Sequence, residues 1–167
     1  MRTDNRTVLD DDTLVARALA GDRAAFGELV RRHQRAALRV AAIVSGSTDD
    51  ARDIAQDAFV LAHRRLATFR RRGTFRSWVL RIVANQAKNH VRSRVRAIGR
   101  DDLHARISVR AAAGDDPAEL VEAAASRQAL ADALSRLGHD DRAVLGCRFI
   151  AQLSEAETAA VLELPVG

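Results

Sequence analysis

Apolar residues recur at steps of three and four positions along nearly the whole of this 167-residue chain. Such spacing collects them on one face of an α-helix, which has about 3.6 residues per turn. A half-buried strand would instead alternate apolar and polar residues, and no segment of the sequence does so. The pattern therefore predicts an all-α protein.

Residues typical of helix ends divide the first part of this pattern into four helices. Gly21 ends the first helix, and the Ser-Gly-Ser break at 45–47 ends the second. We assign the four helices to a first domain, residues 1–96. The predicted helices cover 12–20, a segment capped by Asp22, a segment capped by Ser47 or Thr48, and a segment that opens at Thr74 and runs to about Val95.

The helical spacing of apolar residues is absent over residues 97–117, where glycine, proline and acidic residues surround isolated apolar ones. We interpret this segment as a linker to a second helical domain, residues 118–167. Ser154 and Glu157 have the spacing of a capping box at the start of the last helix, and the final Leu-Pro-Val-Gly predicts a turn. The predicted helices of this domain are 118–137, 140–150 and a short helix from Ser154.

Basic residues are concentrated in one segment. Residues 58–100 contain 12 of the 27 lysine and arginine residues and none of the 22 acidic ones, so the rest of the chain is net negative. A basic block of this kind is typical of a polyanion-binding surface, with nucleic acid the first candidate and an acidic membrane the second. A solvated arginine-rich face is the alternative, although such faces usually mix both signs. The basic residues are Arg64, Arg65, Arg70, Arg71, Arg72, Arg76, Arg81, Lys88, Arg92, Arg94, Arg96 and Arg100.

The predicted fourth helix has a cationic and an apolar side. At about 100° per residue, its donors form a stripe about four turns long, opposite Val79, Ile82 and Val83. The helix is therefore expected to pack on one side and to present donors to a nucleic acid on the other. The stripe consists of Arg81, Asn85, Lys88, Arg92 and Arg96.

Trp78 lies at the edge of this stripe, and the sequence leaves two interpretations open. Its ring could stack on an unpaired base, or it could anchor the core of the domain. The basic loop of residues 70–73 precedes the helix, and a loop of this kind could hold a base flipped out of a melted duplex.

The predicted third helix carries a polar ridge opposite its apolar side. Carboxylates one turn apart could bind a metal or act as acid and base, but no histidine or third carboxylate has the required spacing. A solvated face, or a docking ridge for a basic partner, is the better interpretation. We predict no metal and no other cofactor, and no motif indicates an enzyme. The ridge consists of Asp49, Asp53, Gln56, Asp57 and Val60.

Cysteine content and hydropathy predict the cellular compartment of the protein. The single cysteine, Cys147, excludes an internal disulfide and a zinc site of paired thiolates, and we predict that it is buried. No window approaches the roughly 18 consecutive apolar residues that a membrane span needs. These features indicate a protein of a reducing cytoplasm with no membrane insertion.

Two strings, D-I-A-Q-D-A-F at 53–59 and F-R-S-W-V-L-R-I-V-A-N at 75–85, flank Phe69 and the basic loop. Together they resemble region 2 of the extracytoplasmic-function (ECF) sigma factors, the small two-domain members of the bacterial sigma-70 family. The second domain, with L-S-E-A-E at 153–157 and L-P-V-G at 164–167, resembles the start of their region 4. The resemblance implies a four-helix region 2, a flexible linker and a helix-turn-helix. It also implies a factor that directs RNA polymerase to promoters and melts the −10 element.

The resemblance assigns roles to the two polar faces. The ridge is expected to dock on the clamp helices of the largest subunit of core RNA polymerase, and the loop and fourth helix are expected to bind promoter DNA. An anti-sigma factor is a further candidate partner. The polymerase-binding positions are Asp53, Gln56, Asp57 and Val60. The DNA-binding positions are Arg70, Arg71, Arg72, Thr74, Arg76, Trp78, Arg81, Asn85, Lys88 and Arg92.

One departure from the family concerns the second domain. In the family, the helix after L-P-V-G enters the major groove of the −35 element, and this sequence stops before it. We therefore expect a region 4 that is cut short and an apolar face that is partly uncovered. Three alternatives stay open: a sigma factor that recognises promoters through its first domain only, a nucleic-acid-binding regulator that is not a sigma factor, and a truncated fragment that only binds a partner. The face in question comprises Val144, Phe149, Val161 and Leu164.

Overall fold

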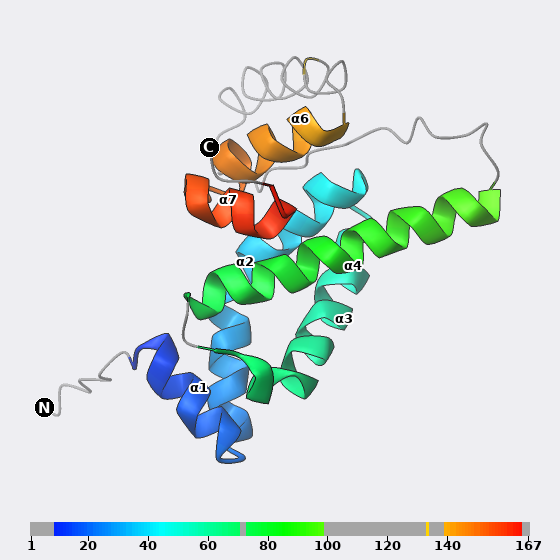
Figure 1. Cartoon of the computed structure of the whole chain (residues 1–167). Helices are drawn as coiled ribbons and strands as arrows, with labels where there is room; N and C mark the ends of the chain where they lie inside the picture. Colours follow the sequence, from blue (N-terminus) through cyan, green and yellow to red (C-terminus); the bar gives the residue numbers. More distant parts are fainter. Residues whose placement is uncertain (1–8, 71–72, 99–132, 134–138, 165–167) are drawn as a thin grey trace, which may run out of the picture.

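The computed structural model describes residues 9–70, 73–98, 133 and 139–164, and every regular element within them is helical (Figure 1). The predicted all-α class is therefore confirmed. The predicted helix over 118–137 falls outside the described residues except for Ala133, as do the linker beyond residue 98 and the turn beyond residue 164. The elements are α1 (Asp11–Leu19), α2 (Arg23–Ser45), α3 (Ala51–Arg64), the short 3-10 helix η1 (Leu66–Thr68), α4 (Phe75–Ile98), α6 (His139–Leu145), η2 (Gly146–Ile150) and α7 (Glu155–Leu162).

Aspartate caps start the first two helices, each within one residue of the predicted position. The Asp10 carboxylate accepts a hydrogen bond from the amide of Thr13 at 2.7 Å, and the Asp22 carboxylate accepts one from the amide of Ala25 at 3.1 Å. α2 ends at Gly46, whose φ of 71° is left-handed and therefore favours a residue without Cβ. These boundaries depend only on neighbouring residues, which explains why the sequence predicts them.

The predicted cap of the third helix is wrong. The residue that precedes α3 is Asp50, and Ser47 lies in the turn before it, where its hydroxyl oxygen accepts a hydrogen bond from the Asp50 amide at 3.2 Å. The Asp50 carboxylate does not cap the helix either, because it pairs with Arg94 of α4 at 2.9 Å. A tertiary ion pair has replaced the local cap.

The core lies between α2, α3 and α4, with α1 packed against α2 (Figure 1). Many of its side chains are alanine, which lets the helix axes approach one another closely. α4 is longer than predicted and ends at Ile98 instead of about Val95. Side chains that are fully buried include Leu29, Ala37, Val40 and Ala41 of α2, Ala58 and Ala62 of α3, and Val79, Leu80, Val83, Ala84 and Ala87 of α4.

Asp11 of α1 forms polar contacts with two residues of α2. Its two carboxylate oxygens lie 3.1 Å from Arg32 Nη1 and 2.6 Å from His33 Nε2. Arg32 Nη1 also donates to the carbonyl of Leu9 at 2.6 Å. The N-terminal helix is therefore tied to the bundle by polar contacts as well as by its buried Leu14 and Val15.

The predicted single helix over 140–150 is instead two elements, α6 and the π-helical turn η2. Gly146 and Cys147 are buried, and a Cβ at Gly146 would lie 2.6 Å from Ile43 Cγ2 of α2. We attribute the change of helix type to this packing, which the periodicity of the segment does not encode. The Ser154–Glu157 capping box is confirmed, since each side chain accepts a hydrogen bond from the other residue's amide.

α6, η2 and α7 form a C-terminal unit that lies on α2 and α4 (Figure 1). Of the helices that the structure describes, none is long and apolar enough to cross a membrane.

Candidate nucleic-acid and protein interfaces

α4 presents its donors as the sequence predicts. Thr74 opens the helix, and its hydroxyl oxygen accepts a hydrogen bond from the Ser77 amide at 3.1 Å. Arg81 and Arg92 are exposed, opposite the buried face that contains Val83. Within the described residues, neither guanidinium pairs with an acidic side chain. Two cations of the stripe are therefore open to an external anion.

Two other members of the stripe face α7. Asn85 Nδ2 donates to Glu163 Oε1 at 3.2 Å, and Lys88 Nζ donates to the carbonyl of Leu162 at 3.2 Å. Both donors come from the middle of α4, and both acceptors lie where α7 ends. The sequence offered no sign of this contact, because its partners are separated by more than 70 positions along the chain.

Arg76, near the start of α4, also faces the C-terminal unit. Its Nη2 lies 3.4 Å from the carbonyl oxygen of Ala151 and 3.5 Å from that of Gln152. Its Nη1 lies 3.6 Å from Glu157 Oε1. Three of the predicted DNA-binding residues on α4 thus have acceptors in α7, in the residue that follows it, or in the loop between η2 and α7.

Trp78 belongs to an aromatic cluster. Its ring centroid lies 5.4 Å from that of Phe69 and 5.7 Å from that of Phe75, and the side chain is half-buried. Phe75 is almost completely buried. These contacts favour the packing interpretation of Trp78, although part of the ring remains accessible.

The basic loop before α4 is only partly described. Arg70, Gly73 and Thr74 are exposed, whereas Arg71 and Arg72 lie outside the described residues.

The ridge on α3 is exposed along its whole length. Asp53, Gln56 and Asp57 all face solvent, and the large apolar side chain of Val60 is 46% exposed. Neither Asp53 nor Asp57 forms an ion pair within the described residues. No three His, Cys, Asp or Glu side chains in the described part of the chain gather as a metal site would require.

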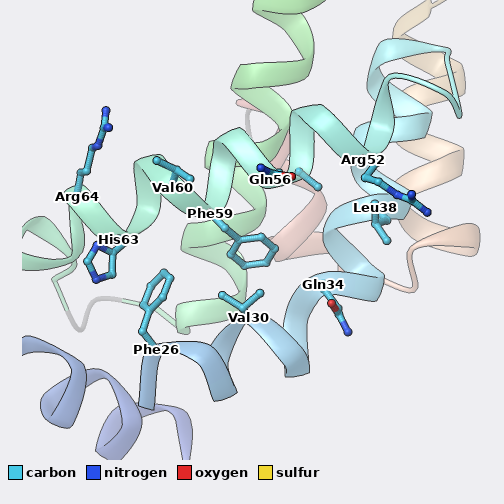
Figure 2. A pocket seen from close by; sticks show the side chains of 11 residues that line it. Phe26, Val30, Gln34, Leu38, Arg52, Gln56, Phe59, Val60, His63 and Arg64 are labelled. Carbon is cyan, nitrogen blue, oxygen red and sulfur yellow. The ribbon is translucent and has the colours of Figure 1, made fainter. Parts of the chain in front are cut away.

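An apolar groove runs beside the ridge, between α2 and α3 (Figure 2). It has a volume of about 630 Å³, and Phe26 and Phe59 form its floor together with Val30. The ring of Phe26 meets that of His63 edge-on, with centroids 4.7 Å apart. The groove was not predicted from the sequence. A signal for it was available in α2, where apolar residues at helical spacing extend beyond the buried face to Leu38, which is 38% exposed and lines the groove.

Asp50 forms a second feature that the sequence did not reveal. His90 Nε2 lies 3.3 Å from the same carboxylate oxygen that Arg94 contacts, without a well-aligned hydrogen bond. Burial alone would raise the pKa of Asp50, but the hydrogen bond with Ser47 and the charges of His90 and Arg94 hold it below its usual value. The carboxylate therefore joins the start of α3 to the C-terminal half of α4.

The apolar face expected on the C-terminal unit is uncovered only in part. Phe149 is 74% exposed and Leu164 is exposed, but Val161 is completely buried and Val144 is partly buried. The covered part is the part around Val161, because α7 packs that side of the helix against the bundle. Cys147 is buried as predicted, and burial raises the pKa of its thiol to about 11.

Known proteins are similar to this chain in sequence and in structure. Residues 29–97 match the family model of Sigma-70 region 2. The ECF RNA polymerase sigma-E factor of Escherichia coli strain K12 is 33% identical over 167 residues, which cover 95% of this chain and 86% of the relative. The RNA polymerase sigma-H factor of Pseudomonas aeruginosa is 33% identical over 165 residues, 94% of this chain and 84% of the relative.

A solved structure has the same arrangement of helices. The structure of CnrH in complex with the cytosolic domain of CnrY matches with a TM-score of 0.65 and 30% sequence identity, over 94% of this chain and 86% of that one. These relatives favour a sigma factor over a nucleic-acid-binding regulator of another kind, and a sigma factor acts in initiation without being an enzyme itself. The chain belongs to the ECF sigma factors of the sigma-70 family, which act with RNA polymerase to initiate transcription.

Proposed function

We propose that this sigma factor divides its two contacts between neighbouring helices. The α3 ridge and the adjoining groove dock on core RNA polymerase, and the exposed side of α4 with the loop before it binds and melts the −10 element of the promoter. The observation that carries the proposal is the juxtaposition, on consecutive helices of one bundle, of an arginine-bearing face and an acidic ridge whose Asp53 and Asp57 form no ion pair within the described residues.

The polymerase side combines charge with apolar surface. Asp53 and Asp57 supply a negative ridge, and the groove beside it offers Val60 and Leu38 as exposed apolar contacts. A basic amphipathic helix fits such a surface, since its apolar face can enter the groove and its cations can meet the ridge. The clamp helices of the largest polymerase subunit are our assignment for this partner.

The DNA side depends on two arginines of α4 that pair with no acidic side chain in the described part of the chain. Arg81 and Arg92 are exposed and lie on the same side of α4, so both can contact phosphates of one strand. Arg70 and Thr74 are exposed just before the start of the same helix, whose first turn carries the half-buried Trp78. The loop can then hold a flipped base beside this ring while the donors of α4 contact the strand from which the base comes. We assign Arg71 and Arg72 to the same contact by resemblance alone.

The polymerase contact is tested by charge reversal. The double variant Asp53→Arg/Asp57→Arg should no longer be captured by core RNA polymerase in a pull-down, because two attractive contacts become repulsive. The matched control is Asp140→Arg/Asp141→Arg on α6, where two exposed carboxylates change by the same charge. Equal capture of both double variants would show that the ridge is not the docking surface.

We also propose an anti-sigma factor as a partner in the bacterial cytoplasm. Support comes from the CnrH structure, in which a relative is bound to the cytosolic domain of another protein, CnrY. The exposed Phe149 and Leu164 offer an apolar surface for such a partner.

A further inference from the structure

A buried histidine of α2 contacts the start of α4. His33 is 9% exposed, and it is one of the two polar side chains, with Thr158, that are buried in the described part of the chain. Its ring centroid lies 5.5 Å from that of Phe75, the first residue of α4, and the two ring planes are tilted by 47°. Phe75 is 1% exposed and contacts the rings of Phe69 and Trp78. His33 therefore extends the aromatic cluster of Trp78 into the core of the bundle.

The imidazole of His33 is also held by α1. Its Nε2 lies 2.6 Å from Asp11 Oδ2, and because a carboxylate only accepts hydrogen bonds, this nitrogen carries the proton. The other oxygen of Asp11 lies 3.1 Å from Arg32 Nη1, and Arg32 Nε lies 3.1 Å from Glu28 Oε1. The carboxylate of Asp11 is therefore fixed by Arg32 as well, and its charge stays paired even without the histidine.

Packing alone does not explain a histidine at this position. A buried polar group costs free energy unless it has a partner, whereas a leucine would fill the same space beside Phe75 without needing one. The hydrogen bond with Asp11 supplies what a leucine lacks, which is a single fixed orientation of the side chain. A group whose rotamer is locked in this way can in turn hold the group that packs on it.

We propose that His33 is a positioning residue for the base-binding end of α4. Asp11 fixes the imidazole, the imidazole fixes Phe75, and Phe75 fixes the ring of Trp78 in the first turn of the helix. A flipped base then meets a ring that is already oriented, so less freedom is lost when the base binds. The inference rests on the proposed function, which assigns Trp78 and the loop before α4 to DNA.

Replacing the histidine by an apolar residue separates positioning from stability. In the full chain, His33→Leu removes the oriented ring but leaves no group without a partner, so the free energy of unfolding should be kept. The fluorescence of Trp78, the single tryptophan, reports the cluster directly. We expect stronger quenching by acrylamide, emission at longer wavelength, and an affinity for a labelled single-stranded DNA of mixed sequence that falls by about fivefold.

A control variant shows what a loss of stability does by itself. Val44 is 1% exposed and lies about 16 Å from His33 along the axis of α2. Val44→Ala should therefore lower the free energy of unfolding, measured by circular dichroism, without changing the emission of Trp78 or the DNA affinity. A shift in Trp78 emission as large as that of His33→Leu would contradict a specific role of the histidine.

Asp11→Ala reaches the same contact from its partly exposed end and keeps the test decisive if His33→Leu perturbs the bundle. It should change the emission of Trp78 and the DNA affinity in the same direction as His33→Leu, whereas Asp12→Ala, with the same charge change in the same turn, should not. The two effects should not add in the double variant Asp11→Ala/His33→Leu, because both act through one contact. Additive effects would show that Asp11 acts by another route and would overturn the proposed chain of contacts.

The outcomes separate this inference from the proposed function. Arg81→Ala in the same binding assay tests the DNA face, and an unchanged affinity would overturn that assignment. If Arg81→Ala weakens binding but His33→Leu and Asp11→Ala match their controls, the DNA face stands and the positioning role is refuted. A changed emission of Trp78 with an unchanged DNA affinity also refutes it, because the histidine then orders the cluster without serving the DNA contact.

Discussion

The change Trp78→Ala distinguishes a structural from a DNA-binding role for the single tryptophan. Truncating a fully buried Phe or Trp costs about 3–5 kcal/mol, and the half-buried side chain of Trp78 brings this to about 2 kcal/mol. The two ring contacts, with Phe69 at 5.4 Å and Phe75 at 5.7 Å, add together about 1 kcal/mol. We therefore expect the free energy of unfolding to fall by about 3 kcal/mol.

Urea unfolding followed by far-UV circular dichroism measures this change. Tryptophan fluorescence does not serve, because the chain contains one Trp and the variant removes it. Trp78→Phe is the matched control, since a smaller ring keeps part of the packing and should lose much less stability. Promoter opening by the polymerase holoenzyme is measured in parallel at a temperature where all variants are folded.

The result that would refute the packing argument is specific. Suppose that Trp78→Ala loses less than about 1 kcal/mol of stability while promoter opening is abolished. Then the ring acts on DNA, and its contacts with Phe69 and Phe75 contribute little to stability. A loss of stability near the expected value, with opening restored by Trp78→Phe, supports the structural role.

Two further predictions concern electrostatics. Asp50→Asn should lower the free energy of unfolding by about 1 kcal/mol at neutral pH, because the ion pair with Arg94 is lost. The pKa of Asp50 is depressed in the folded state, so this contribution is present above the unfolded pKa and disappears as the pH falls through the folded one. Thermal melts at several pH values should therefore show the melting temperatures of the wild type and Asp50→Asn converging in acid. A difference in melting temperature that stays the same at every pH would argue against the ion pair. Arg81→Ala should reduce the slope of log affinity against log salt by about one phosphate contact, whereas Arg23→Ala, an exposed arginine at the start of α2, should leave it unchanged.

Much of the fold follows from local patterns that can be read directly. Helical periodicity predicted the class, Asp22 and Gly46 predicted the limits of α2, and the Ser154–Glu157 pair predicted the start of α7. The same periodicity placed Arg81 and Arg92 on the outer side of α4, and Asp53 and Asp57 on that of α3. These features need only residues within a turn or two of each other.

Contacts between distant segments were decided by the tertiary structure alone. The sequence determined which side chains each helix turns outward, because that depends on a period of about 3.6 residues. It did not determine that Asp50 would pair with Arg94 instead of capping α3, that a groove would open beside Val60, or that α7 would cover Lys88. Each of these depends on how whole helices pack, and packing joins residues whose separation along the chain carries no signal.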